Sequence, residues 1–129
     1  MNTTLKKTAA TLTLLALPAT AIAATTVPAS ADTERHGRCG TGGYELSVDR
    51  EGRGYEVNVD LDRVTPGSTW TLALRHEGKR YVKVTRTADA EGDLDLETFR
   101  RGTPGNETFA FTAKRVGGTE KCGTKVTVR

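Results

Sequence analysis

Apolar and polar residues alternate along most of the chain after residue 43. In YELSV (44–48) and YEVNVDL (55–61), tyrosine, leucine and valine fall at every second position, with Glu, Ser, Asn and Asp between them. The same alternation recurs in TWTLAL (69–74), LDLET (94–98) and TFAFTAK (108–114). An apolar residue at every second position is typical of a half-buried β-strand, whereas an amphipathic helix repeats about every 3.6 residues. The pattern therefore predicts an all-β domain.

Seven strands are predicted, beginning near residues 44, 55, 69, 80, 93, 108 and 124, and turn residues such as Pro66 and Gly67 separate them. Each strand has one apolar and one polar face, which favours two antiparallel sheets packed through their apolar faces. Seven strands in about 90 residues is the count expected of an immunoglobulin-like domain. We therefore predict a seven-stranded antiparallel immunoglobulin-like β-sandwich over residues 44–129, with a small closed barrel as the alternative.

The first 31 residues have the layout of a cleavable secretory signal peptide. Lys6 and Lys7 precede an uncharged, largely apolar stretch that runs to Ala31. Small residues suit signal peptidase, so we expect cleavage between Ala31 and Asp32, with cleavage after Ala23 as the alternative. The apolar stretch is shorter than the roughly 20 residues that a membrane-spanning helix needs. The protein is therefore expected to be secreted and extracellular, with no membrane attachment after signal cleavage.

Residues 32–43, DTERHGRCGTGG, link the expected signal peptide to the predicted sandwich. They are polar, rich in glycine and without hydrophobic periodicity. Such a composition indicates a flexible lead-in rather than a strand. The expected organisation is therefore a signal peptide over residues 1–31, a lead-in over 32–43 and one sandwich domain over 44–129.

The charge balance argues against a strongly basic mature protein. The chain has 19 Lys and Arg against 16 Asp and Glu, but Lys6 and Lys7 leave with the signal, so 17 basic residues face 16 acidic ones. The two signs are interspersed along the sequence, as on an ordinary soluble surface. Binding to nucleic acid or to anionic lipid would favour a basic stripe, so we predict neither partner.

The two cysteines, Cys39 and Cys122, are expected to form one disulfide. Each is followed by Gly-Thr and stands just before a predicted strand. A zinc site would need two further ligands, for which His36 and His76 are the only histidines. Exported thiols are usually oxidised, which favours the disulfide. We expect this bridge to hold the first and last predicted strands side by side and parallel.

Residues suited to catalysis or metal binding are sparse. The two serines after the signal peptide, Ser47 and Ser68, do not lie in a Gly-x-Ser-x-Gly sequence. The alternating acids of DAEGDLDLE (89–97) could ligate Ca²⁺, but Gly92 is misplaced for an EF-hand loop and the intervening leucines suit a strand with one solvated face. We therefore predict no enzyme activity, no catalytic residues, no cofactor and no metal site.

Several segments together resemble a known family. They are a leader ending in PASA (28–31), STWTLALRHEG (68–78), RYVKVTRTA (80–88), GDLDLE (92–97) and FAFTAKRVGGTEKC (109–122). Their spacing and apolar positions are similar to those of small secreted actinobacterial proteins whose domain is an immunoglobulin-like or fibronectin-like sandwich closed by one terminal disulfide. The resemblance covers roughly residues 39–129. It implies the fold and the disulfide, but no catalytic or binding residues, because the functions of such proteins are mostly unassigned.

Two functions are compatible with these features. The first is a monomeric, non-catalytic extracellular module that binds a protein or surface partner through its loops or an exposed edge strand. The second is a small protease inhibitor or small-ligand carrier. For an inhibitor, the candidate interaction loop is RRGTPGNE (100–107), in which Arg100 and Arg101 would suit a trypsin-like enzyme and Pro104 would stiffen the backbone.

Overall fold

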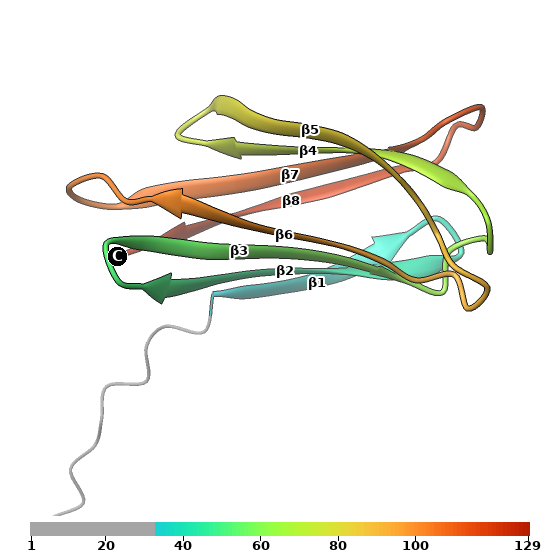
Figure 1. Cartoon of the computed structure of the whole chain (residues 1–129), viewed down its shortest axis with the longest axis horizontal. Coiled ribbons are helices and arrows are strands. Elements are labelled where there is room, and N and C mark those ends of the chain that lie inside the picture. The colour runs from blue at the N-terminus through green and yellow to red at the C-terminus, as the bar shows by residue number, and fades with distance from the viewer. Residues whose placement is uncertain (1–32) are drawn as a thin grey trace, which may run out of the picture.

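A computed structural model describes residues 33–129, and every regular element in that part is a β-strand. The eight strands are β1 (Glu34–Cys39), β2 (Gly42–Glu51), β3 (Gly54–Asp62), β4 (Thr69–His76), β5 (Lys79–Thr87), β6 (Leu94–Arg101), β7 (Glu107–Arg115) and β8 (Lys121–Val128). They form two four-stranded antiparallel sheets that face each other, as Figure 1 shows. The all-β sandwich predicted from the sequence is confirmed, with eight strands instead of seven. The expected signal peptide lies outside the described residues.

The two sheets are built from strands that are not all consecutive in the chain. One sheet has the order β1-β2-β3-β6 and the other has the order β5-β4-β7-β8. The chain crosses between the sheets after β3, after β5 and after β6 (Figure 1). Each sheet therefore combines segments from both halves of the sequence.

The core is the layer of apolar side chains between the two sheets. Trp70 and Phe109 have no exposed surface, and Val57 on the facing sheet is equally buried. These are aromatic and β-branched residues, which pack well on a pleated surface. Full burial of one such side chain stabilises the fold by about 1.5–3 kcal/mol. The alternation read from the sequence is thus the alternation between this core and the solvated outer faces.

The segment expected to be a flexible lead-in contains a strand, so that prediction is wrong. β1 pairs with β2 along its whole length, from Glu34 opposite Ser47 to Cys39 opposite Gly42. Only Cys39 of β1 is buried, and its other five residues are exposed. An edge strand that buries almost nothing carries no apolar period, which is why the sequence pattern missed it.

The disulfide between Cys39 and Cys122 is present, with 5.1 Å between the two Cα atoms. It joins the end of β1 to the start of β8 and so links the edges of the two sheets. The predicted first strand is β2, which runs in the same direction as β8 in Figure 1, as expected. The expected side-by-side pairing of these two strands is wrong, because β8 pairs with β7 and lies in the other sheet. The bridge therefore holds one sheet to the other at one end of the sandwich.

Candidate functional site

The outer face of the sheet β1-β2-β3-β6 is strongly acidic. Alternate residues on these strands point away from the core, and the cross-strand pairing places them on one surface. Its charged residues are the carboxylates of Glu34, Glu45, Asp49, Glu51, Glu56, Asp60, Asp62, Asp95 and Glu97 and the guanidinium groups of Arg38 and Arg101. We call this surface the acidic face.

The outer face of the other sheet, β5-β4-β7-β8, has the opposite charge. Its outward positions carry six basic side chains and no acidic one among the described residues. The six are Arg75, Arg80, Lys83, Lys114, Lys121 and Lys125. None of them forms an ion pair within residues 33–129. We call this surface the basic face.

The interpretation that the two signs are interspersed on the surface is therefore wrong. The acids come from segments 34–62 and 95–97, and the bases come from segments 75–83 and 114–125. Both pairs of segments are separated in the chain, and only the strand order brings each pair into one sheet. The net charge sums over both faces and so conceals the segregation. A count of charges strand by strand would have been the useful signal.

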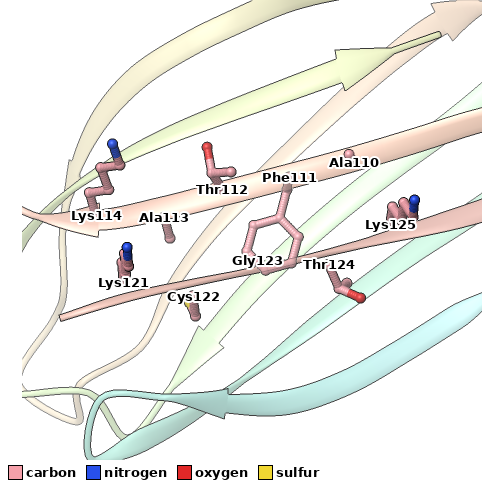
Figure 2. Close-up of a pocket in the computed structure, with 10 residues that line it drawn as sticks. All are labelled: Ala110, Phe111, Thr112, Ala113, Lys114, Lys121, Cys122, Gly123, Thr124 and Lys125. Carbon is pink, nitrogen blue, oxygen red and sulfur yellow. The ribbon is translucent and has the colours of Figure 1, made fainter. Parts of the chain in front are cut away.

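Two shallow hollows lie next to each other on the basic face. One has a volume of about 610 Å³ and runs over β7 and β8, where Ala110, Thr112 and Gly123 are among its lining residues. The other, of about 330 Å³, runs over β4, β5 and β7. Both are lined by Thr112 and Lys114, so they adjoin across the sheet. Figure 2 shows Thr112 and Lys114 on the outer side of the strands and Phe111 on the inner side.

The cross-strand pairing arranges this surface in three rows. The middle row is Lys83, Ala73, Thr112 and Gly123, the second is Thr85, Thr71, Lys114 and Lys121, and the third is Arg80, Arg75, Ala110 and Lys125. A shift in the pairing of β4 with β5 at Leu74 and Arg75 places Arg80 opposite Arg75. The middle row is therefore a floor made mostly of small side chains, and basic side chains flank it. We call this feature the transverse groove.

Like charges also stand opposite one another on the acidic face. Asp60 pairs with Glu45 on one neighbouring strand and with Asp95 on the other. Burial raises the pKa of Asp60, and the negative charges of Glu45, Asp95 and Asp62 raise it further. Like charges in direct cross-strand positions are unfavourable. The acidic face is therefore a repulsive arrangement that the fold tolerates.

A buried polar cluster lies at the end of the sandwich opposite the disulfide. Oε1 of Glu107 accepts hydrogen bonds from the backbone N–H of Thr103, from the Thr103 hydroxyl (2.8 Å) and from Nε2 of His76 (2.9 Å). Nε of Arg100 donates to Nδ1 of His76 at 3.2 Å. Because Nδ1 accepts this bond, Nε2 is the ring nitrogen that faces Glu107.

The surroundings of Glu107 keep it ionised. Burial by itself raises the pKa of Glu107, but hydrogen bonds from Thr103, Tyr55 and His76 outweigh this and hold the pKa below its ordinary value. Burial raises the pKa of Tyr55, and its hydrogen bond to Glu107 raises it further. The side chains of His76 and Glu107 are only 3% and 1% exposed. The cluster thus lies inside the sandwich, and Arg100 of β6 connects it to the other sheet.

The two serines do not complete a catalytic set with His76. Ser68 donates to the carbonyl oxygen of Thr65 and accepts from Trp70 Nε1 at 2.8 Å. Ser47 donates to Asp49 on the acidic face at 2.8 Å. The cluster around Glu107 was not predicted, because His76 and Glu107 are 31 residues apart in the sequence. The available signal was that both are polar residues at core-facing strand positions.

The residues of the candidate interaction loop are separated by the structure. Arg100 and Arg101 belong to β6, so the loop between β6 and β7 begins at Gly102. The Arg100 guanidinium points to His76 and lies over the Tyr81 ring, 4.8 Å from its centroid. Arg101 and Pro104 are exposed. Only the latter two are thus available to a partner, and the inhibitor hypothesis stays a prediction.

The alternating acids of residues 89–97 do not come together as a metal site. Asp89 Oδ1 accepts from the backbone N–H groups of Glu91 and Asp93, at 3.0 and 2.9 Å, and so stabilises the turn before β6. Asp95 and Glu97 belong to the acidic face. Over residues 33–129, no three His, Cys, Asp or Glu side chains are grouped so that they could hold a metal ion.

No protein-family model matches the chain, and no curated protein matches it either. Within the described part of the chain there is no helix of the length and apolar character needed to cross a membrane. The basic face is the candidate functional site because it carries charge of one sign and contains the transverse groove.

Proposed function

We propose that this protein is a secreted, non-catalytic β-sandwich module that binds an anionic extracellular partner through its basic face. The observation that carries the proposal is the segregation of charge, with six unpaired bases and no acid on the outward positions of one described sheet. A surface that carries one sign of charge attracts partners of the opposite sign over a distance of about one Debye length.

The position of the bases supports binding rather than stability. Lys114 stands opposite Lys121, and Arg75 stands opposite Arg80. Such like-charged pairs weaken a sheet, because each group repels the one across from it. An anion placed between the members of each pair would turn this repulsion into attraction. An anionic partner would therefore relieve the repulsion on this face.

We further propose that the sandwich is immunoglobulin-like. In a constant-type immunoglobulin domain, strands A, B, E and D form one sheet and strands C, F and G form the other. Taking β2, β3 and β6 as A, B and E, and β4, β7 and β8 as C, F and G, reproduces these neighbours. β5 then pairs with β4 in place of β6, and β1 is an additional edge strand.

Secretion is part of the same proposal. A disulfide that closes 83 residues of chain is typical of an oxidising, extracellular environment. The layout of residues 1–31 supports export. Sequencing the N-terminus of protein recovered from the culture medium is expected to give Asp32, and protein that keeps its leader inside the cell would contradict export.

Binding is tested with charge reversals on the two faces. We expect the purified protein to be retained on dextran sulfate beads at low salt and released as salt rises. Lys121→Glu with Lys125→Glu should abolish retention, because both lysines project from β8 on the basic face. Arg38→Glu with Arg101→Glu makes the same change in net charge on the acidic face and is the matched control. Equal losses in both variants would show that only net charge matters and would contradict the proposal.

A further inference from the structure

We infer that the transverse groove is a binding site for a linear polyanion without bases, of the polyphosphate type, which lies across the four strands. This inference rests on the proposed function, since it names the ligand class of the basic face.

The groove is shaped for a chain and not for a small ion. Its floor crosses all four strands through Lys83, Ala73, Thr112 and Gly123. Four strands at a spacing of about 4.8 Å give it a length of roughly 14 Å between the outermost strands. The flanking rows are four residues apart along β4, β7 and β8, or about 13 Å. A single polymer chain fits between them, and a folded domain does not.

The floor is low because its side chains are small. Ala73 is 8% exposed, and Gly123 has no side chain above the sheet. A Cβ atom built on Gly123 would lie 2.4 Å from the carbonyl oxygen of Phe111, so β8 approaches β7 there more closely than any side chain allows. The flanking Lys114 and Lys121 rise beside this floor (Figure 2). Their ammonium groups can therefore approach a chain in the groove from the side.

The cations stand where successive anionic groups would meet them. Lys114 and Lys121 lie on one side of the floor, Arg80, Arg75 and Lys125 lie on the other side, and Lys83 stands at the β5 end of the floor itself. At β8 a polymer that crosses the sheet passes between Lys121 and Lys125, and at each of the other three strands it meets one basic side chain on one flank. Repeating phosphates would satisfy several of these charges at once, which one phosphate ion cannot do.

Other partner classes fit less well. No aromatic side chain is found on the outward positions of the described basic face, because Tyr81 turns inward to Thr98 and Phe99 belongs to the acidic face. Single-stranded nucleic acid gains much of its affinity from bases stacked on such rings, so bases would add little here. The whole face measures roughly 500 Å² by strand spacing, below the about 800 Å² per partner of a stable protein interface. That argues against an acidic protein or the acidic face of a second copy.

The experiment measures binding of inorganic polyphosphate by isothermal titration calorimetry, with orthophosphate at the same phosphate concentration for comparison. We expect polyphosphate to bind and orthophosphate not to. Thr112→Phe fills the middle of the floor without a change of charge and should weaken polyphosphate binding about tenfold, because the chain can then reach the cations of only one flank at a time. Thr127→Phe, on the same face but outside the groove, is the matched control and should bind as the unchanged protein does. Both variants are checked for unchanged melting temperature.

The outcomes separate this inference from the proposed function. If the lysine reversals abolish binding while Thr112→Phe leaves it unchanged, the basic face binds anions diffusely and the groove site is wrong, although the proposed function stands. If the lysine reversals also leave polyphosphate binding unchanged, the groove site and the proposed function are both wrong. Mixed-sequence single-stranded DNA that binds more than about tenfold tighter than polyphosphate of equal charge would show that bases are recognised and would overturn the base-free ligand class. Oligomers that form in low salt without polymer and dissociate with Lys121→Glu would make a second copy the occupant instead.

Discussion

The two ends of the sandwich are held together across the sheets in different ways. At one end the disulfide between Cys39 and Cys122 joins the edge strands β1 and β8. At the other end Arg100 of β6 donates to His76 of β4, and His76 in turn contacts Glu107 of β7. The first link is covalent and independent of pH, whereas the second depends on an ionised carboxylate. The difference shows which conditions should open which end.

The links also act on different states of the chain. A disulfide stabilises mainly by restricting the unfolded chain. The Glu107 cluster stabilises the folded state, in which His76 meets a residue 31 positions away in the chain. Selective removal of either link therefore separates an unfolded-state effect from a folded-state effect.

The largest effect is expected from removal of the covalent link. Cys39→Ser with Cys122→Ser should lower the free energy of unfolding by about 4.5 kcal/mol at most, from the entropy of closing an 83-residue loop. Urea unfolding at pH 7 measures it, and reduction of the unchanged protein is the control that should give the same loss. A loss of less than about 1 kcal/mol would contradict the view that the disulfide stabilises the protein through the entropy of loop closure.

The second largest loss of stability is expected at the end of the sandwich that holds the Glu107 cluster. Glu107→Gln should lower the free energy of unfolding by about 2–3 kcal/mol, because Thr103 and His76 lose a charged acceptor in a buried site. Glu91→Gln makes the same substitution at an exposed loop position and should change stability little. Urea unfolding at one pH measures the free energy of unfolding of both variants. Equal effects would mean that burial of the cluster is energetically irrelevant.

The pH dependence should distinguish the two ends. Because the folded-state pKa of Glu107 lies below its unfolded value, its contribution is fully present above about pH 4.5 and is lost as the pH falls through the folded-state pKa. Asp60, with a raised pKa, acts in the opposite sense and gains stability on acidification. Urea unfolding between pH 7 and pH 2 should show an acid loss that Glu107→Gln reduces and that the double serine variant retains. An identical acid loss in Glu107→Gln would contradict the role assigned to this carboxylate.

The sequence predicted those strands that have a buried face. In β3, and in β7 from Phe109 to Ala113, each inward residue is apolar and lies in the core, so the period of two is visible without knowledge of the partner strands. β1 is exposed along all but its last residue and shows no such period. The disulfide pairing was predictable because only two cysteines exist, but the strand that carries Cys39 was not, because β1 shows no apolar period.

The candidate site was not predictable in the same way. Each row of the transverse groove takes one residue from each of four strands, and these strands are ordered β5-β4-β7-β8. Without that order, Lys83, Lys114 and Lys121 are ordinary exposed bases in separate segments. His76 and Glu107 likewise meet only because the last residue of β4 lies beside the first part of β7. Long-range strand pairing is therefore the missing information for both features.

The smallest effect is expected from an ion pair at the disulfide end. Nη1 of Arg115 lies 3.0 Å from Oε2 of Glu120, across the turn between β7 and β8, and both side chains are 30% exposed. Partly solvated pairs of this kind contribute about 0–1 kcal/mol, because water screens the charges in either state. Glu120→Gln should therefore lower the melting temperature by at most a few degrees, and the backbone bond from Arg115 N–H to the Glu120 carbonyl should persist. A loss as large as that of Glu107→Gln would mean that the disulfide end also relies on charge, and the contrast between the two ends would fail.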